Sequence, residues 1–300
     1  EASGSLDEVL SHADAACYAA KDRGRNRVHL FQPDDIQAQE RQGQIQWASR
    51  LQEALDKDLF RLYFQTIVPL ENSDNIMPHY EILARMIGPE GEIIPPGAFI
   101  PAAERFGLMP KIDQWVIRNT LSWMGDQLRQ NQQPVFCSIN LSGASIGRED
   151  CLQLIQEQLE KRKVPANNIC FEITETAAIA DPANAGRFIT ELKRLGCQFA
   201  LDDFGSGLSS FGYLKQLPVD YLKIDGIFIQ ELANNRIDQA MVASINNIGH
   251  IMGLKTIAEF VEDAATLNIL RQIGVDYVQG FYLSRPEPLE SLMSVRVMPR

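Results

Sequence analysis

The sequence lacks the long apolar segments and the paired cysteine motifs that would point to a membrane or to a disulfide framework. No run of eighteen apolar residues occurs, so we expect no membrane span and no membrane contact from this chain. The five cysteines form an odd set without a CxxC pair, which favours reduced, buried thiols and a cytoplasmic protein. The chain begins without a signal segment or a starting Met, so we expect it to be part of a longer protein. A membrane anchor elsewhere in that longer protein is compatible with this expectation.

Positive charge and histidine are also scarce. The chain has 28 Lys and Arg against 39 Asp and Glu, and its formal charge of -11 argues against binding DNA, RNA or an anionic membrane. The four histidines show no HxH or HExxH spacing, so we do not expect a histidine-centred metal site. A small anionic ligand is still compatible with this charge, provided that some carboxylates hold metal ions.

The first 58 residues differ in pattern from the rest of the chain. Residues 1–35 contain a helical pattern and one short apolar run, too little to bury a core, so we interpret them as the end of an upstream domain. Residues 36–58 are polar with apolar positions at Ile45, Trp47, Leu51 and Leu55, which predicts an exposed amphipathic linker helix. Residues 59–300 then form the main unit.

This main unit alternates short apolar runs with longer helical patterns. The predicted strands are Arg61–Val68, His79–Ile87, Val135–Leu141, Ile169–Thr174, Gln198–Asp203, Val219–Asp225, Lys255–Val261 and Val275–Phe281. The predicted helices include Lys111–Arg129, Asp150–Arg162, Pro182–Leu195 and Ile237–Met252. Eight such units predict an α/β fold of the (β/α)8 TIM-barrel type. The connection between the first two strands is too short for a helix, so we expect an antiparallel first strand, with a doubly wound open sheet as the alternative.

Polar side chains gather near the carboxyl ends of these strands. They are Glu81, Asn140, Glu172, Asp202, Asp203, Lys223, Asp225, Glu259 and Gln279. In a barrel these ends meet at one mouth, where such enzymes build their active sites. Several buried carboxylates in one place require cations, and a set of oxygen ligands suits Mg2+ or Mn2+ better than zinc.

Two neighbouring features admit more than one interpretation. Asp202 and Asp203 both face the mouth only if the strand ends there; one would then bridge two metal ions, although an Asp pair also commonly opens a turn. Lys223 would orient an attacking water, form a Schiff base as in an aldolase, or simply pair with a carboxylate. The loop from Asp203 to Ser210 is rich in glycine and is a weak signal for a phosphate site.

A competing motif is Gly143-Ala-Ser145-Ile-Gly147, which fits the GxSxG pattern of α/β-hydrolases. That pattern places its Ser on a sharp turn between a strand and a helix. Here the apolar run ends by Leu141, and the only later histidine, His250, lies within a helical pattern. We therefore give a Ser-His hydrolase little weight.

Several ordered motifs together carry a family resemblance. They are Glu81-Ile-Leu83 with Arg85, Ser138-Ile-Asn140-Leu-Ser142, Glu172-Ile-Thr-Glu175, Leu201-Asp-Asp-Phe-Gly-Ser-Gly207, Leu222-Lys-Ile-Asp225, Ala258-Glu-Phe-Val-Glu262 and the segment Gln279 to Pro286. In these motifs residues 59 to about 290 resemble the EAL domain of cyclic di-GMP phosphodiesterases. Residues 6–31 resemble the end of a GGDEF domain without its signature, so this piece is not expected to synthesise cyclic di-GMP.

The resemblance implies attack of a metal-activated water on cyclic di-GMP, the substrate, to give linear pGpG. It implies two Mg2+ or Mn2+ ions, one held by Glu81, Asn140, Glu172 and Asp202, the other by Asp202, Asp203 and Glu259. Lys223 would join Glu81, Glu259 and the two aspartates as a catalytic residue that positions the attacking water. The implied substrate contacts are Gln65, Leu83, Arg85, Asp225, Glu262, Gln279 and Pro286. Glu175 would order the loop after Asp203, which is associated with the expected homodimer.

Three positions depart from the family pattern, and none removes a metal ligand. Ile82 stands where the motif has Ala, Thr66 where Pro is usual, and Phe260 where Gly commonly follows the metal-binding Glu. Phe260 is expected to crowd the second metal site. The alternative to an active enzyme is therefore a catalytically weak or silent cyclic di-GMP receptor that signals through the linker helix.

Overall fold

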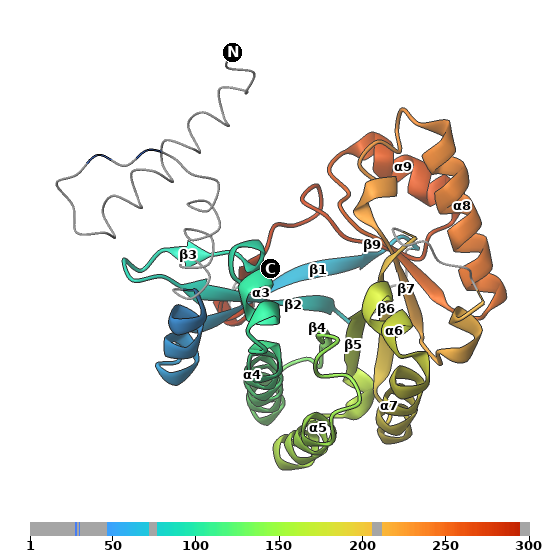
Figure 1. Cartoon of the computed structure of the whole chain (residues 1–300). Helices are drawn as coiled ribbons and strands as arrows, with labels where there is room; N and C mark the ends of the chain where they lie inside the picture. Colours follow the sequence, from blue (N-terminus) through green and yellow to red (C-terminus); the bar gives the residue numbers. More distant parts are fainter. Residues whose placement is uncertain (1–27, 29, 31–46, 72–76, 206–211, 295–300) are drawn as a thin grey trace.

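The computed structural model describes residues 28, 30, 47–71, 77–205 and 212–294 (Figure 1). The predicted GGDEF-like remnant, apart from Val28 and Leu30, and the first half of the predicted linker helix lie outside these residues. Within the described chain, no helix is both long enough and apolar enough to cross a membrane.

Eight strands close into a barrel. They are β1 (Phe60–Pro69), β2 (His79–Ile87), β4 (Phe136–Asn140), β5 (Ile169–Thr174), β6 (Gln198–Phe204), β7 (Tyr221–Ile224), β8 (Lys255–Ala258) and β9 (Tyr277–Val278). From β2 to β9 neighbouring strands pair in parallel, whereas β1 closes the ring antiparallel to both β2 and β9. The predicted (β/α)8 barrel with an antiparallel first strand is confirmed, and the open sheet is wrong because β1 joins both edges.

The β1–β2 ribbon continues beyond the barrel. Phe60 pairs with Met86, and two short strands extend the ribbon: β3 (Ile93–Ile94) pairs with β2 and β10 (Glu287–Pro288) pairs with β1. Because β1 is antiparallel, its amino-terminal half lies on the same side as the carboxyl end of β2. The ribbon therefore extends past the mouth of the barrel, to the left in Figure 1.

Helices surround the barrel between the strands. They are α3 (Pro96–Arg105), α4 (Met109–Arg129), α5 (Glu149–Arg162), α6 (Glu175–Ala180), α7 (Pro182–Leu195), α8 (Arg236–Ile251), α9 (Ala264–Ile273) and the short α10 (Ser291–Ser294). Side-chain caps set several starts; for example, Asp181 accepts from the Asn184 amide and Asp263 from the Thr266 amide. The four predicted helices agree with α4, α5, α7 and α8 to within two residues at each end.

The described end of the predicted linker is a helix over residues 47–56 that packs on the barrel. Leu51 and Ala54 are fully buried in the main core, and Trp47 and Leu55 pack beside them. The expectation of an exposed helix is wrong for this part, because its apolar face covers the β1–β2 end of the barrel.

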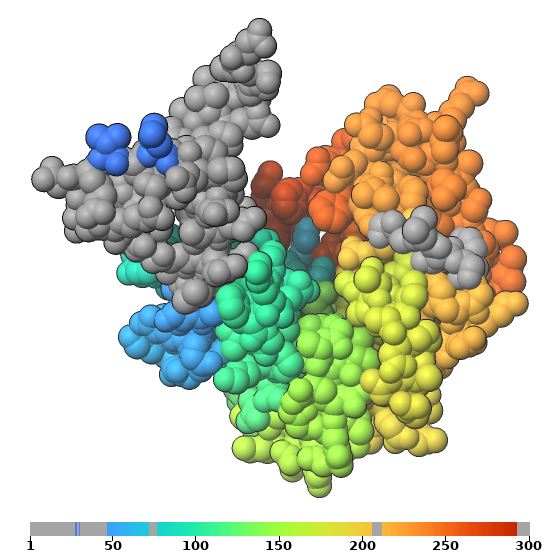
Figure 2. Space-filling view, in the orientation of Figure 1, coloured from blue at the N-terminus to red at the C-terminus, as the bar shows by residue number. Residues whose placement is uncertain are grey.

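Two hydrophobic cores hold the barrel together. The larger one lies between the strands and the surrounding helices. The smaller one fills the lower half of the barrel interior with Ile67, Phe136, Cys170, Ala200, Tyr221 and Ile257, and Tyr277 packs against it. Successive residues on a strand point to opposite sides, so on the parallel strands the residues two positions further along also face the interior, one layer closer to the mouth. On the antiparallel β1 the corresponding residue lies two positions earlier, at Gln65, which pairs with Glu81. In the space-filling view a hollow opens between the segment with α3 and α4 and the segment with α8 and α9 (Figure 2).

Candidate active site

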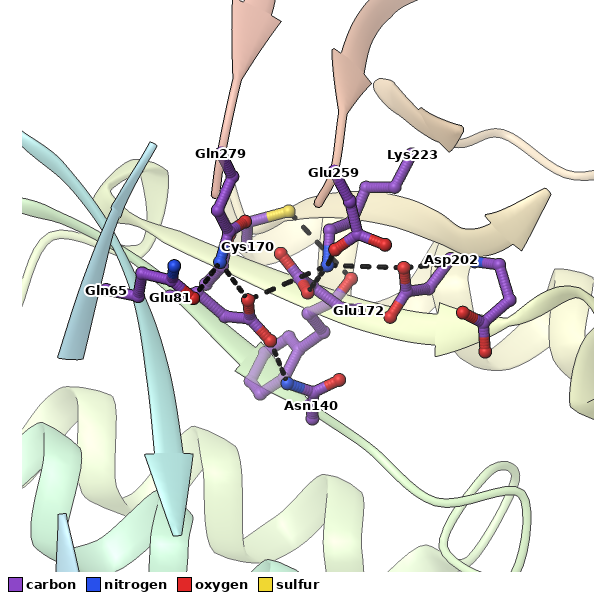
Figure 3. A network of polar contacts seen from close by, with 12 residues as sticks. Gln65, Glu81, Asn140, Cys170, Glu172, Asp202, Lys223, Glu259 and Gln279 are labelled. Carbon is purple, nitrogen blue, oxygen red and sulfur yellow. Dashed lines mark hydrogen bonds and ion pairs between the residues drawn. The ribbon is translucent and has the colours of Figure 1, made fainter. Parts of the chain in front are cut away.

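Most of the polar residues predicted from the strand ends meet in one layer at the mouth of the barrel, namely Glu81, Asn140, Glu172, Asp202, Lys223, Glu259 and Gln279 (Figure 3). Four of them lie two positions after a residue of the smaller core: Glu172 after Cys170, Asp202 after Ala200, Lys223 after Tyr221 and Glu259 after Ile257. Their bases are fixed by the parallel register, in which Asn140 pairs with Glu172 and Thr174 with Asp202. The sequence therefore places the set, and the closed barrel brings it together.

Lys223 lies at the centre of this layer and is completely buried. Its Nζ is 2.5 Å from Glu172 Oε2, 2.8 Å from Glu259 Oε1 and 3.2 Å from Asp202 Oδ1. A fourth carboxylate, Glu81, is 3.9 Å away. One cation thus faces four carboxylates, so the layer keeps an excess of negative charge.

An amide network orients Glu81. Asn140 Nδ2 donates to Glu81 Oε1 at 2.6 Å, and Gln279 Nε2 donates to Glu81 Oε2 at 2.6 Å. Gln279 also reaches Gln65 Oε1 at 3.1 Å, and Gln65 Nε2 donates to the Ser284 carbonyl at 2.9 Å. The Glu81 carboxylate is therefore held from both sides by amide donors.

The backbone at the end of β6 explains how adjacent aspartates share the mouth. The pairing register shifts between Leu201 and Phe204, and Asp203 has a φ of 55°. A bulge of this kind redirects side chains near active sites. Asp202 is buried and Asp203 is exposed, yet ligand oxygens of both come within 4.8 Å of one another and of Glu259. The expectation that the strand ends at this pair is wrong, because β6 continues to Phe204, and the bulge instead brings the two carboxylates together.

The residues present fit the implied divalent cations. The donors are carboxylate and amide oxygens, as Mg2+ and Mn2+ prefer, and Asp202, Asp203 and Glu259 form a compact cluster. Glu172 Oε1 and Gln279 Oε1 are buried without a hydrogen-bond partner among the described residues. An unpaired buried carboxylate oxygen is costly, and a cation would satisfy it.

The pKa values of the cluster reflect first its burial and then its excess of negative charge. Burial raises the pKa of Glu172 to about 8 and that of Glu259 well above its usual value, despite attraction by Lys223. Burial, followed by repulsion from Asp202, raises the pKa of Asp203 to about 6. Burial disfavours the charged form of Lys223, but its carboxylate neighbours together raise its pKa well above the ordinary value. A protonated, ion-paired lysine is a poor nucleophile, which argues against the Schiff-base alternative.

A pocket of about 320 Å3 opens onto this layer. Its lining combines the polar mouth with apolar side chains. The lining residues are Gln65, Glu81, Leu83, Asp202, Asp203, Glu259, Phe260, Glu262, Gln279, Gly280 and Phe281. Four of the seven residues predicted to contact substrate, namely Gln65, Leu83, Glu262 and Gln279, therefore line the pocket.

The other three predicted substrate contacts lie outside this lining. Arg85 Nη1 donates to the Ala84 carbonyl at 2.9 Å, and its guanidinium carbon lies 5.4 Å from the centre of the Tyr63 ring. The Asp225 carboxylate accepts from the Ile227 amide at 2.9 Å, capping a short helical turn. Pro286 is half-buried in the segment between β9 and β10. Their roles as contacts stay predictions.

Ser145 of the GxSxG pattern is a structural residue. It is buried, and its Oγ donates to Asp113 Oδ2 at 2.6 Å. The Ser142 amide and hydroxyl donate to the same oxygen at 3.1 and 2.5 Å, although burial still raises the pKa of Asp113 to about 6. This cluster anchors the turn after β4, and no sequence motif pointed to Asp113.

Glu175 holds the start of the loop that follows β6. The Gly205 amide donates to Glu175 Oε2 at 2.9 Å, and the Tyr213 hydroxyl donates to Glu175 Oε1 at 2.5 Å. Residues 206–211 lie outside the described chain. The sequence motif identified Glu175, whereas Tyr213 carried no local signal because only the fold brings it across.

The family model of the EAL domain matches residues 48–286. The cyclic di-GMP phosphodiesterase PdeB of Shewanella oneidensis is 43% identical over 286 residues, which cover 95% of this chain and 33% of that protein. The cyclic di-GMP phosphodiesterase PdeF of Escherichia coli is 36% identical over 241 residues, which cover 80% of this chain and 32% of that protein. The chain thus spans about a third of the length of these two relatives.

A solved structure has the same fold. The EAL domain of FimX from Pseudomonas aeruginosa, bound to c-di-GMP, superposes with a TM-score of 0.74 at 33% identity, covering 80% of this chain and 96% of that one. Its similarity supports the barrel.

Proposed function

Because the chain belongs to the EAL-domain family, we propose that it hydrolyses cyclic di-GMP to linear pGpG with two bound Mg2+ or Mn2+ ions. The observation that carries this proposal is the single layer in which four of the six expected oxygen ligands, Glu81, Glu172, Asp202 and Glu259, surround the buried Lys223. The named relatives PdeB and PdeF support the same substrate and reaction.

In this proposal the side chains divide into two ligand groups. Glu81, Asn140, Glu172 and Asp202 would hold one ion, and Asp202, Asp203 and Glu259 the other. When bound, the two ions would supply a lowered pKa for the attacking water and neutralise the charge that develops on the phosphate. The amide donors on Glu81 fix its orientation before substrate arrives, which is the preorganisation that such chemistry requires.

Lys223 has two tasks in the proposed reaction. As the one cation among four carboxylates, it holds the ligand layer together, and its ammonium would position the attacking water. The water oxygen bonds to one phosphorus, the bond from that phosphorus to the ribose 3′ oxygen breaks, and this oxygen leaves as a hydroxyl after taking a proton. One such cleavage opens the ring to pGpG.

The decisive experiment measures pGpG formation with Mg2+, without Mg2+ and in Glu81→Ala. We expect turnover only in the wild-type chain with Mg2+, and a loss of about a thousand-fold or more in the variant, because several kcal/mol of charge stabilisation depend on the ions. Circular dichroism of Glu81→Ala checks that the barrel is retained. Binding of cyclic di-GMP without any pGpG from the wild-type chain would overturn the enzymatic proposal.

The second candidate is a receptor that binds cyclic di-GMP and cleaves it weakly or not at all. Phe260 favours it, because this residue follows Glu259 directly and lines the pocket. The FimX domain bound to c-di-GMP is a related barrel that holds the intact dinucleotide. The same assay separates the two candidates, since only the enzyme forms pGpG.

The remaining proposals concern domain organisation, location and assembly. We infer from the sequence motifs that residues 1–35 end a GGDEF-like domain and that residues 36–58 connect it to the barrel at 59–300. A cytoplasmic homodimer, regulated through Glu175 and the loop after β6, belongs to the same proposal.

A further inference from the structure

Phe260 occupies a backbone conformation that side chains seldom adopt. Its φ is 53°, in the left-handed region, directly after Glu259 at the end of β8. A non-glycine residue held there costs free energy, and such outliers gather at functional sites. The ring is nevertheless 51% exposed and lines the pocket, so burial of the ring does not explain why the position carries an aromatic side chain.

The neighbouring chain leaves room for this ring at one point. A Cβ atom added to Gly226 would lie 2.3 Å from Phe260 Cδ2 and 2.7 Å from Cγ. Gly226 follows Asp225 at the start of the turn after β7. The Phe260 ring therefore packs against the backbone of this turn, with its remaining surface toward the pocket.

A second aromatic side chain of the pocket lining, Phe281, lies in a segment held by backbone hydrogen bonds, and the Arg285 guanidinium carbon lies 4.7 Å from the centre of its ring. The Val261 amide donates to the Gln279 carbonyl, and the Tyr282 amide donates to the Val261 carbonyl, both at 3.0 Å. Gly280 is required here, since a Cβ atom would lie 2.1 Å from the Val261 oxygen. Phe281, 50% exposed and also in the pocket lining, follows this glycine.

The pocket lining thus combines carboxylates with two half-exposed aromatic rings. Metal ions would bind the carboxylates and phosphates would bind the ions, but neither interacts favourably with a flat apolar surface. Purine bases do, because each presents a π-face that stacks on an aromatic side chain. A ring whose far side is packed against backbone loses little freedom when a base covers it.

We propose that Phe260 is a substrate-binding residue that stacks against a guanine base of cyclic di-GMP. This assignment rests on the proposed function for its ligand, but it concerns binding and not the cleavage step. Phe260 would then raise affinity at the position where the family commonly has glycine.

The test compares Phe260→Gly with Phe260→Tyr. Glycine suits the left-handed backbone, so the first variant keeps the fold while removing the ring, and tyrosine keeps a ring. Asn131→Gly is the matched control, since Asn131 has the same φ sign, 55°, in a turn after α4 that is outside the pocket lining. The dissociation constant of the bisphosphorothioate analogue of cyclic di-GMP, a slowly hydrolysed probe, is measured by titration calorimetry with Mg2+.

We expect Phe260→Gly to bind the analogue about ten-fold more weakly, in line with one lost stacking contact. Phe260→Tyr and Asn131→Gly are expected to stay within about two-fold of the wild-type chain, a difference far below one stacking contact. Gly226→Ala should also weaken binding, because its methyl group displaces the ring. Unchanged affinity in Phe260→Gly would overturn the proposal.

Competition by GMP and by ribose 5-phosphate shows whether the base is the partner. Loss of the ring should weaken GMP and leave ribose 5-phosphate unaffected; equal weakening of both would contradict stacking. A wild-type chain that binds the analogue but makes no pGpG would refute the enzymatic proposal alone. Unaltered binding in Phe260→Gly with intact turnover would refute stacking alone.

Discussion

Lys223 and Tyr221 lie on the same strand and face the same barrel interior, yet they belong to opposite environments. Around Lys223, four carboxylates compete for one cation. Around Tyr221, the rings of Phe136 and Tyr277 pack with centroids 6.1 Å away. Two residues along the strand therefore separate a charged layer that lowers the stability of the fold from an apolar layer that raises it.

The smaller core at the base of the barrel, called the base layer below, treats polar groups differently from the mouth. His79 is the main polar side chain described there, and its ring lies 4.6 Å from that of Phe136 with Nε2 2.9 Å from Ser138 Oγ. Burial, with the nearby charges of Lys223 and Lys255, lowers its pKa to about 3, so it is neutral. The base layer thus excludes charged side chains, whereas the mouth gathers them. The barrel tolerates the like charges at the mouth because its stabilising apolar packing lies in other layers.

The largest expected effect comes from neutralising a mouth carboxylate. Glu259→Gln should lower kcat by about a thousand-fold through loss of a metal ligand. It should also raise the melting temperature of the metal-free protein, because one of several buried like charges disappears. Turnover and thermal unfolding in EDTA measure the two effects. A fall in both would show that the mouth stabilises the fold.

The opposite result is expected in the base layer. Phe136→Ala should lower the free energy of unfolding by about 3–5 kcal/mol, because it leaves a cavity among buried rings. KM for cyclic di-GMP of the folded fraction should stay unchanged. Denaturant titration gives the stability, and Phe136→Leu is the milder control. A selective rise in KM with little loss of stability would break the distinction between the layers.

The smallest effect concerns pH. The pKa of His79 is lowered from 6.5 to about 3, so between these values the unfolded chain binds more protons than the folded one. Stability is therefore present above pH 6.5 and is lost on acidification, by about 1 kcal/mol between pH 6 and pH 5. His79→Gln should flatten this slope in denaturant titrations. An identical slope in the variant would assign the pH dependence to other groups.

The sequence predicted the inward-facing polar residues of the mouth better than the points at which the strands end. Strand periodicity located Glu172, Asp202 and Lys223, because a polar residue within an apolar run needs a reason to be buried. The same periodicity overextended β8 and β9, which end at Ala258 and Val278. The left-handed backbone at Phe260 and the close approach at Gly280 end these strands, and neither follows from hydropathy.

Contacts between distant segments were beyond prediction from the sequence. Asp113 collects three hydrogen bonds from the turn after β4, and Tyr213 reaches Glu175 across the β6 loop. Neither residue lies in a pattern with its partner. The helix over residues 47–56 looked like a linker because amphipathicity indicates an apolar face but not the surface that covers it.

By itself, the sequence determined the order of the strands, the alternation that turns Glu81, Glu172 and Lys223 inward, and the chemistry of the set they form. Those properties follow from the period of a strand and from side-chain type, both of which are local. Only the tertiary structure decided that Lys223 lies among four carboxylates, that Asp203 turns to the same side as Asp202, and that Phe260 rests on Gly226. These depend on barrel closure and on backbone angles at strand ends, which bring together residues that are far apart in the chain.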